Sequence, residues 1–310
     1  MASVTLAESA KLSQDELVQG VIENVITVDQ FFQVLPFDEI EGNALAYNRE
    51  NALGDVIRAG VGTTFSGAGA GRGAATFSHV TSALTTIMGN ADVNGLIQAT
   101  RSNKTDQAST QIASKAKSAG RDYRSQLNTG DGTSESFTGL ISLCAASQKA
   151  TTGATGSAIS FEILDELLDL VVDKDGQVDF ILMPARTIRA YKALLRALGG
   201  TPASEAVNLA SGGQVIGYNQ IPIFRNDYIP VNQTKGGTPN CTSIFAGTLD
   251  DGSRRFGIAG LTGPGDAAGI TVEDVGLAED SDDHIWRVKW YCGLALFNEK
   301  GLAMADGITN

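Results

Sequence analysis

Apolar side chains recur every three or four residues in several segments, and this spacing predicts helices over 13–35, 103–128, 160–172 and 184–198. Ser13 and Ser160 stand where N-caps are expected, and Pro184 stands at the first helical position of the last segment. Pro36 ends the first helix. The twelve residues before Ser13 are predicted to form a loose arm.

The segment 103–128 predicts a helix with one apolar and one basic face. At a rise of 1.5 Å per residue it would be roughly 39 Å long. The residues predicted to face the core are mostly small, so another backbone can approach closely: Ala108, Ile112, Ala116, Ala119, Tyr123 and Leu127. The residues predicted on the opposite face are Lys104, Lys115, Lys117, Arg121 and Arg124.

Runs rich in β-branched and other apolar residues predict strands, most of them in the second half of the chain. They cover 45–50, 82–88, 93–100, 178–183, 215–218, 221–224, 242–246, 255–258, 270–275 and 285–297. Helices and strands do not alternate in a regular β-α-β order, so the predicted fold class is α+β.

The stretch from Asn51 to about Ser82 is rich in Gly, Ala, Ser and Thr and has no apolar period. Loops of this length inside a compact chain are usually functional or disordered. Because it lies between two strand-like runs, we expect a long hairpin that reaches away from the body. Its large side chains Phe65, Arg72 and Phe77 are the candidates for contacts with another subunit.

Composition and charge narrow the possible functions. The formal net charge of −12 argues against general binding of nucleic acid through phosphate neutralisation, although the chain could still enclose nucleic acid. The three cysteines are far apart and form no zinc or disulfide pattern. The N-terminus lacks a basic segment followed by an apolar run, which indicates synthesis in the cytoplasm.

Residues that could carry out catalysis are few. His79 and His284 stand apart in the sequence, and no nucleophile elbow accompanies them. The run Gly67–Gly73 lacks the lysine of a phosphate-binding loop, and the carboxylates at 250–251 and 279–283 lack the spacing of a calcium loop. We therefore expect no enzyme, no cofactor and no metal. A surface or adhesin protein and an enzyme are the alternatives from other functional classes.

Several local runs, in their order along the chain, resemble the major capsid proteins of tailed bacteriophages. The most specific run is Val34–Ile40 followed by Gly42–Glu50, which is similar to the passage from arm helix to extended loop in one branch of that family. Gly89–Val93 stands where the chain returns from this loop, and 103–128 is similar to the spine helix. Further similar runs are Val178–Met183, Tyr218–Ile223, Asp227–Pro230, Ile285–Phe297 and Gly301–Ala303.

This resemblance implies the phage major capsid fold, which encapsulins share: an N-terminal arm, an extended β-hairpin loop, a peripheral domain with a long spine helix and an axial domain with a mixed sheet. It implies the following boundaries: 1–34 arm and helix, 35–88 extended loop, 89–178 peripheral domain, 179–284 axial domain, and 285–310 closing strand of the peripheral domain and C-terminal tail.

The function that the resemblance implies is that of a structural virion protein. Copies would self-assemble as hexamers and pentamers into an icosahedral capsid around the phage DNA, without sequence-specific binding and without a membrane. Portal, scaffolding and cementing proteins are further partners that it allows. The alternative is the shell protein of an encapsulin-type nanocompartment. Some relatives crosslink a loop lysine to a neighbour, but residues 51–82 contain no lysine, so we expect non-covalent contacts.

Overall fold

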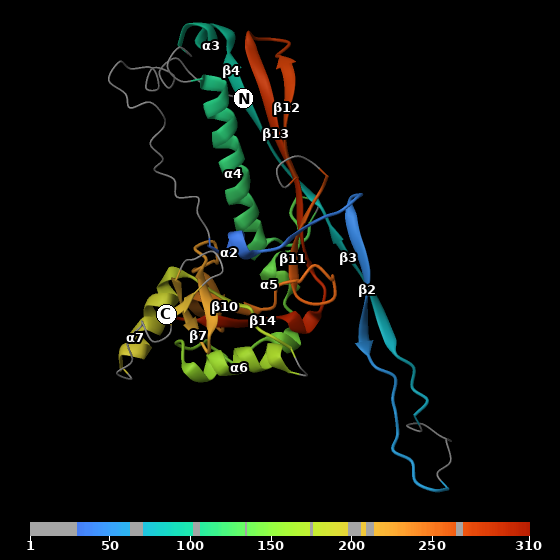
Figure 1. Ribbon diagram of the computed structural model, residues 1–310. Coiled ribbons are helices and arrows are strands. Elements are labelled where there is room, and N and C mark those ends of the chain that lie inside the picture. Colours follow the sequence, from blue (N-terminus) through green and yellow to red (C-terminus); the bar gives the residue numbers. More distant parts are fainter. Residues whose placement is uncertain are drawn as a thin grey trace.

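The computed structural model describes residues 30–62, 71–101, 106–133, 135–173, 176–197, 206–208, 214–264 and 269–310. Of the helix predicted over 13–35, only α2 (Gln30–Val34) belongs to this part, and the predicted arm lies outside it. Figure 1 shows a long helix beside long strands, a second sheet with its own helices, and a hairpin that leaves the body.

A five-stranded sheet is built around the long strand β13 (Asp283–Leu296). β13 pairs antiparallel with β4 (Thr85–Asn94), β12 (Ile270–Leu277) and β11 (Ile258–Thr262). β1 (Phe37–Glu39) pairs parallel with β11. The strand predicted over 285–297 is thus the central strand of a sheet whose other strands come from both ends of the chain.

The long predicted helix is α4 (Gln107–Thr129), which packs on β4 and β13. The carboxylate of Asp106 caps it by accepting from the Ala108 N–H at 3.2 Å. Of the predicted apolar face, Ala108, Ala119, Tyr123 and Leu127 are buried. The helical prediction is confirmed by these residues, and the small ones let α4 lie close to the strands.

One residue assigned to the basic face of this helix was placed wrongly. Arg124 is buried, at 6% exposure, rather than solvated. Its Nε donates to the Gly120 carbonyl at 3.1 Å, and its guanidinium lies over the ring of Tyr228, 5.3 Å from the centroid. A guanidinium can stack on an aromatic face while it keeps hydrogen bonds, and periodicity alone does not reveal such a partner.

The second sheet has seven strands, in the order β14-β10-β5-β8-β7-β6, with β9 paired to β10. Their bounds are β5 Phe180–Met183, β6 Ala206–Asn208, β7 Gln214–Tyr218, β8 Ile221–Arg225, β9 Gln233–Lys235, β10 Thr238–Gly247 and β14 Leu302–Ile308. β5 and β8 are parallel, whereas β10 is antiparallel to β5 and β14. Residues 302–308, expected as part of a tail, are therefore an integral strand.

The side chains of this sheet alternate between two cores, as the period of a strand requires. Ile181 and Met183 of β5 point to one core, together with α6 (Phe161–Val172) and α7 (Ala185–Ala197). Phe180 and Leu182 point to the other, which contains α2, the end of α4 and the short helix α5 (Leu140–Leu143). The sheet is buried on both faces, which explains why Phe180–Met183 reads as a continuous apolar run.

An aromatic cluster joins α4 to the five-stranded sheet. The ring of Tyr123 lies 4.8 Å from Trp290, and its hydroxyl donates to the Gly293 carbonyl at 3.1 Å. Phe37 of β1 closes the cluster, 5.7 Å from Tyr123 between ring centroids. Gly260 leaves room for it, because a Cβ at that position would lie 2.5 Å from the Phe37 ring. Strand β1, helix α4 and strand β13 therefore share one core.

Three strand predictions need correction. The run 93–100 is not a strand: β4 ends at Asn94 and helix α3 (Gly95–Arg101) follows, where the Asn94 side chain accepts from the Leu96 N–H at 3.1 Å. The run 82–88 is divided between two sheets, with a break at Leu84. The strand predicted over 255–258 begins only at Ile258.

The three cysteines are free thiols inside the protein. Burial raises the pKa of Cys144 to about 11 and that of Cys292 further. At a pKa of about 11, roughly one Cys144 thiol in a thousand is a thiolate at pH 8. We expect an aromatic disulfide reagent at that pH to label no cysteine in the native protein and all three after unfolding in urea. Rapid labelling of a native thiol, measured by released chromophore, would contradict their burial.

Candidate intersubunit surface

The two segments on either side of the Gly-rich stretch form the hairpin that the sequence predicted. β2 (Ala44–Ala52) pairs antiparallel with β3 (Thr76–Ala83) and with neither of the other sheets. In Figure 1 this two-stranded ribbon runs from the side of the molecule far into solvent.

The root of the hairpin is fixed to the end of β13. The Tyr47 hydroxyl donates to the Leu296 carbonyl at 2.7 Å, and the Arg49 Nε donates to the Phe297 carbonyl at 3.1 Å. The Tyr47 ring also packs on Phe297, with centroids 5.3 Å apart. Leu45 joins the same small core, beneath the strand ends. Leu45, Tyr47 and Arg49 alternate along β2, so one face of the ribbon is anchored.

Beyond this root the hairpin holds apolar side chains that nothing in the described chain covers. Leu53 is 80% exposed, Val56 92% and Phe77 66%, and Val61 is exposed fully. Scattered exposed apolar residues are ordinary on a protein surface. Here four of them lie on one thin projection, whose two strands cannot bury them against each other. This distal set of Leu53, Val56, Val61 and Phe77 is therefore the candidate surface for a contact with another subunit.

The structure describes two of the three predicted contact residues. Phe77 lies on β3 opposite Glu50, in the exposed part of the ribbon. Arg72 is exposed beside the point where the Asp55 N–H donates to the Gly73 carbonyl at 3.1 Å. Phe65 lies outside the described residues. The fold thus brings Arg72 and Phe77 to the same distal half of the hairpin.

Sequence reasoning did not single out Leu53, Val56 and Val61, the most exposed apolar residues of the hairpin. Their spacing matches neither a helix nor a strand. The signal that could have found them is the combination of aliphatic side chains with a segment that has no core-forming period.

The candidate catalytic groups do not converge. His79 Nδ1 and Asn48 Oδ1 lie 2.9 Å apart across the two strands of the hairpin. His284 Nε2 lies 2.6 Å from Asp274 Oδ1, on the five-stranded sheet. In the part of the chain that the structure describes, no three His, Cys, Asp or Glu residues are grouped as metal ligands would be.

The carboxylate cluster at 250–251 organises a turn. Asp250 accepts from the Gly252 and Arg254 N–H groups at 3.0 and 3.1 Å. Partial burial, with the nearby Asp38 carboxylate, raises the Asp250 pKa. These hydrogen bonds hold residues 250–254 in a turn and explain why β11 starts late. Across the same described ranges, no helix is long and apolar enough to span a bilayer.

Comparison with known proteins identifies the fold. No protein-family model matches the chain, and no curated protein matches it in sequence. The chain is similar to the holo-SrpI encapsulin complex of Synechococcus elongatus, with 18% identity and a TM-score of 0.73 over 99% of this chain and 97% of that one. It is similar to the capsid of cyanophage A-1(L), with 13% identity and a TM-score of 0.70 over 97% and 98%.

A structure of Mycobacterium phage Bobi is also similar, with 13% identity and a TM-score of 0.64 over 100% of this chain and 99% of that one. At these identities the likeness speaks for the fold. The chain has the fold of phage capsid proteins and encapsulins, and the α+β capsid fold predicted from the sequence is confirmed.

Proposed function

We propose that this chain is the major capsid protein of a tailed bacteriophage, whose copies assemble through hexamers and pentamers into an icosahedral shell around the phage DNA. The observation that carries the proposal is the β2–β3 hairpin: its root is bonded to β13, and its distal half exposes Leu53, Val56 and Phe77. A rigidly rooted projection with uncovered apolar side chains suits a contact with a neighbouring copy.

Each apolar side chain of this set would contribute about 1.5–3 kcal/mol if a neighbour buried it fully. A single contact of this kind is weak. A closed shell repeats it in every subunit, so weak contacts add up to a stable particle while each subunit can still dissociate and correct its position.

The proposed role is structural and not catalytic. The two histidines serve separate elements, one on the hairpin and one on the five-stranded sheet. The net charge of −12 suits a shell that encloses DNA without gripping it, because an acidic wall leaves the packaged phosphates unneutralised by the protein. The virion is then the place where the protein acts.

A second candidate is the shell protein of an encapsulin-type compartment. It is favoured by the similarity to the encapsulin of Synechococcus elongatus, over 99% of this chain at a TM-score of 0.73. The two candidates share self-assembly and differ in what the shell contains.

Electron microscopy of the purified protein tests assembly, and we expect closed particles of uniform size. A monomer or dimer that persists at high concentration would contradict both candidates. Particles from the natural source, treated with nuclease, then separate the two. Protected double-stranded DNA supports the capsid, whereas a packaged folded enzyme without DNA supports the compartment.

A further inference from the structure

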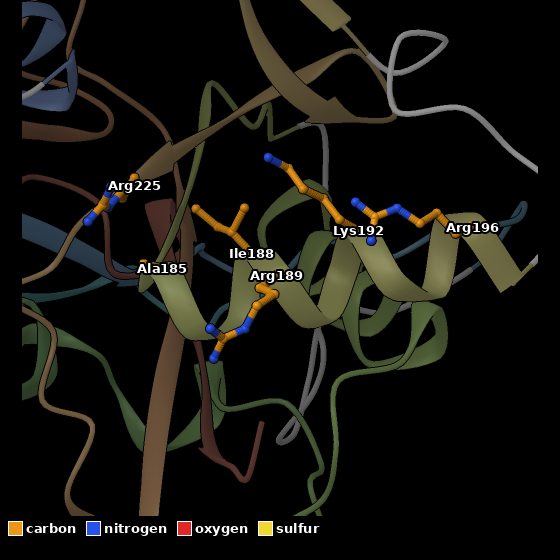
Figure 2. A pocket seen from close by; sticks show the side chains of 6 residues that line it. All are labelled: Ala185, Ile188, Arg189, Lys192, Arg196 and Arg225. Carbon is orange, nitrogen blue, oxygen red and sulfur yellow. The ribbon is translucent and has the colours of Figure 1, made fainter.

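Helix α7 presents a basic stripe to solvent. Its buried side, Thr187, Tyr191 and Leu195, packs toward the seven-stranded sheet. Its other side carries Arg189 and Arg196, both exposed, with the half-buried Lys192 between them. The helix contains no acidic residue. With Ala185, Ile188 and Arg225, these cations line an open cleft of 290 Å³ (Figure 2).

Most of this charge has no anionic partner among the residues that the structure describes. Arg225 pairs with Asp227, with Nη2 and Oδ2 2.5 Å apart. Arg189, Lys192 and Arg196 make no ion pair and no side-chain hydrogen bond with the residues that the structure describes. Within the described part of the chain, whose net charge is −12 overall, these three adjacent cations are therefore available to an anionic partner.

Helix α6 presents the opposite charge. Its buried side faces the same core as α7, and its solvent side carries the exposed residues Glu162, Asp165 and Asp169. The helix contains no basic residue. Asp165 accepts from the Tyr218 hydroxyl at 2.5 Å, while the side chains of Glu162 and Asp169 have no hydrogen-bond or ion-pair partner within the described ranges.

The two stripes match in length and spacing. Residues 162, 165 and 169 are separated by three and four positions, and so are 189, 192 and 196. Each stripe is about 10 Å long at the rise of an α-helix. α6 and α7 touch through Phe161 and Tyr191, whose ring centroids are 6.1 Å apart. No ion pair joins the stripes themselves in the described chain, because both point into solvent.

We propose that the basic stripe of α7 on one copy binds the acidic stripe of α6 on a second copy. The inference rests on the proposed self-assembly and specifies one of its contacts. An arrangement in which one face of a subunit meets a different face of the next generates a ring when the rotation between copies closes. Complementary charge sets the register of such a contact and discourages other pairings.

The experiment reverses the charge of each stripe separately, by substitutions at exposed positions. It then reverses the charges of both stripes in one variant. The α7 variant is R189E/R196E and the α6 variant is E162K/D169K, while Asp165 is kept because of its bond to Tyr218. Sedimentation measures self-association of the full chain. We expect each variant to lose at least about tenfold in association constant, because attraction becomes repulsion. The quadruple variant R189E/R196E/E162K/D169K exchanges the signs of the two stripes. It should recover most of the lost association.

The salt dependence of self-association is an independent test of this contact. Association of the wild-type chain should weaken between about 0.05 and about 0.5 M salt, and that of either reversed variant should not, because only opposite charges gain from low ionic strength. Circular dichroism checks that each variant is folded. If the α7 variant R189E/R196E does not fold, the milder variant R189Q/R196Q takes its place. For that variant we expect a smaller loss in the association constant.

The outcomes distinguish this contact from the proposed function. If the wild-type chain assembles and the α7 variant associates equally well, the contact is refuted and the function stands. If the quadruple variant associates no better than the two reversed variants, the stripes do not contact each other. Loss of bound nucleic acid from α7-variant particles that still assemble would assign the stripe to nucleic acid instead. A wild-type chain that does not self-associate in low salt overturns both proposals.

Discussion

Replacing residues 56–72 by the dipeptide Asn-Gly is expected to prevent shell assembly and to leave the subunit folded. Asp55 and Gly73 are already joined by a backbone hydrogen bond of 3.1 Å, and a two-residue Asn-Gly turn closes such a pair. The ladder from Ala44↔Ala83 to Ala52↔Thr76 and the bonds of Tyr47 and Arg49 at the root are kept. What is removed is the tip, with Val56 and Val61.

Two measurements check this expectation. Far-ultraviolet circular dichroism should be that of the wild-type subunit apart from the missing residues, and electron microscopy should find few closed particles. Loss of soluble folded protein would show that the tip belongs to the core. Particles formed in normal yield would show that the tip makes no contact needed for assembly.

A point substitution tests whether Phe77 on the ribbon contributes to the contact between subunits. Phe77→Ala should weaken the contact between subunits by about 1.5–3 kcal/mol, which is roughly ten- to a hundredfold in its equilibrium constant. His79→Ala is the matched control, since His79 is exposed on the same strand two residues along but offers little apolar area. Equal losses from the two variants would argue against an apolar contact through Phe77.

Tyr123→Ala is expected to lower the free energy of unfolding by about 3–5 kcal/mol, as truncation of large buried aromatic residues does. Tyr123 is fully buried, packs against the ring of Trp290 and also contacts Phe32, Phe37 and Phe137. Tyr123 joins α4 to Phe37 of β1 and to Trp290 of β13. The cavity therefore opens where three elements share one core.

Urea unfolding of dissociated subunits measures this loss, with Tyr123→Phe as the control. The phenylalanine variant keeps the ring and loses only the hydrogen bond to the Gly293 carbonyl, so its loss should be about 1 kcal/mol. Similar losses for the two variants would mean that the hydrogen bond, and not the packing, is the larger contribution.

The elements that could be predicted are those whose signal is local. α6 begins where Ser160 caps it, with the hydroxyl accepting from the Ile163 N–H at 3.3 Å, and its apolar period is contained within twelve residues. β13 and α4 are likewise marked by apolar residues within a single continuous segment. Local patterns of this kind persist in the fold because tertiary packing buries the faces that they define.

The elements that could not be predicted depend on partners far away in the sequence. Residues 93–100 have the composition of a strand, but β4 stops at Asn94 because Gly95 donates its N–H to the Asp282 carbonyl at 2.7 Å and the chain turns into α3. Arg124 has the position of a surface cation, but Tyr228 covers it. Neither partner lies within reach of a local window.

The sequence by itself determined that the chain contains segments with an apolar period that can form a core. It also determined that the stretch between 51 and 82 lacks such a period. It also indicated a structural rather than a catalytic role and the capsid fold. Only the tertiary structure decided which side chains of the hairpin are anchored and which are exposed. That division depends on Tyr47 and Arg49 meeting the carbonyls of Leu296 and Phe297, about 250 residues along the chain. It likewise brought the charged faces of α6 and α7 onto one layer, because pairing between distant strands, and not the order of residues, places the two helices.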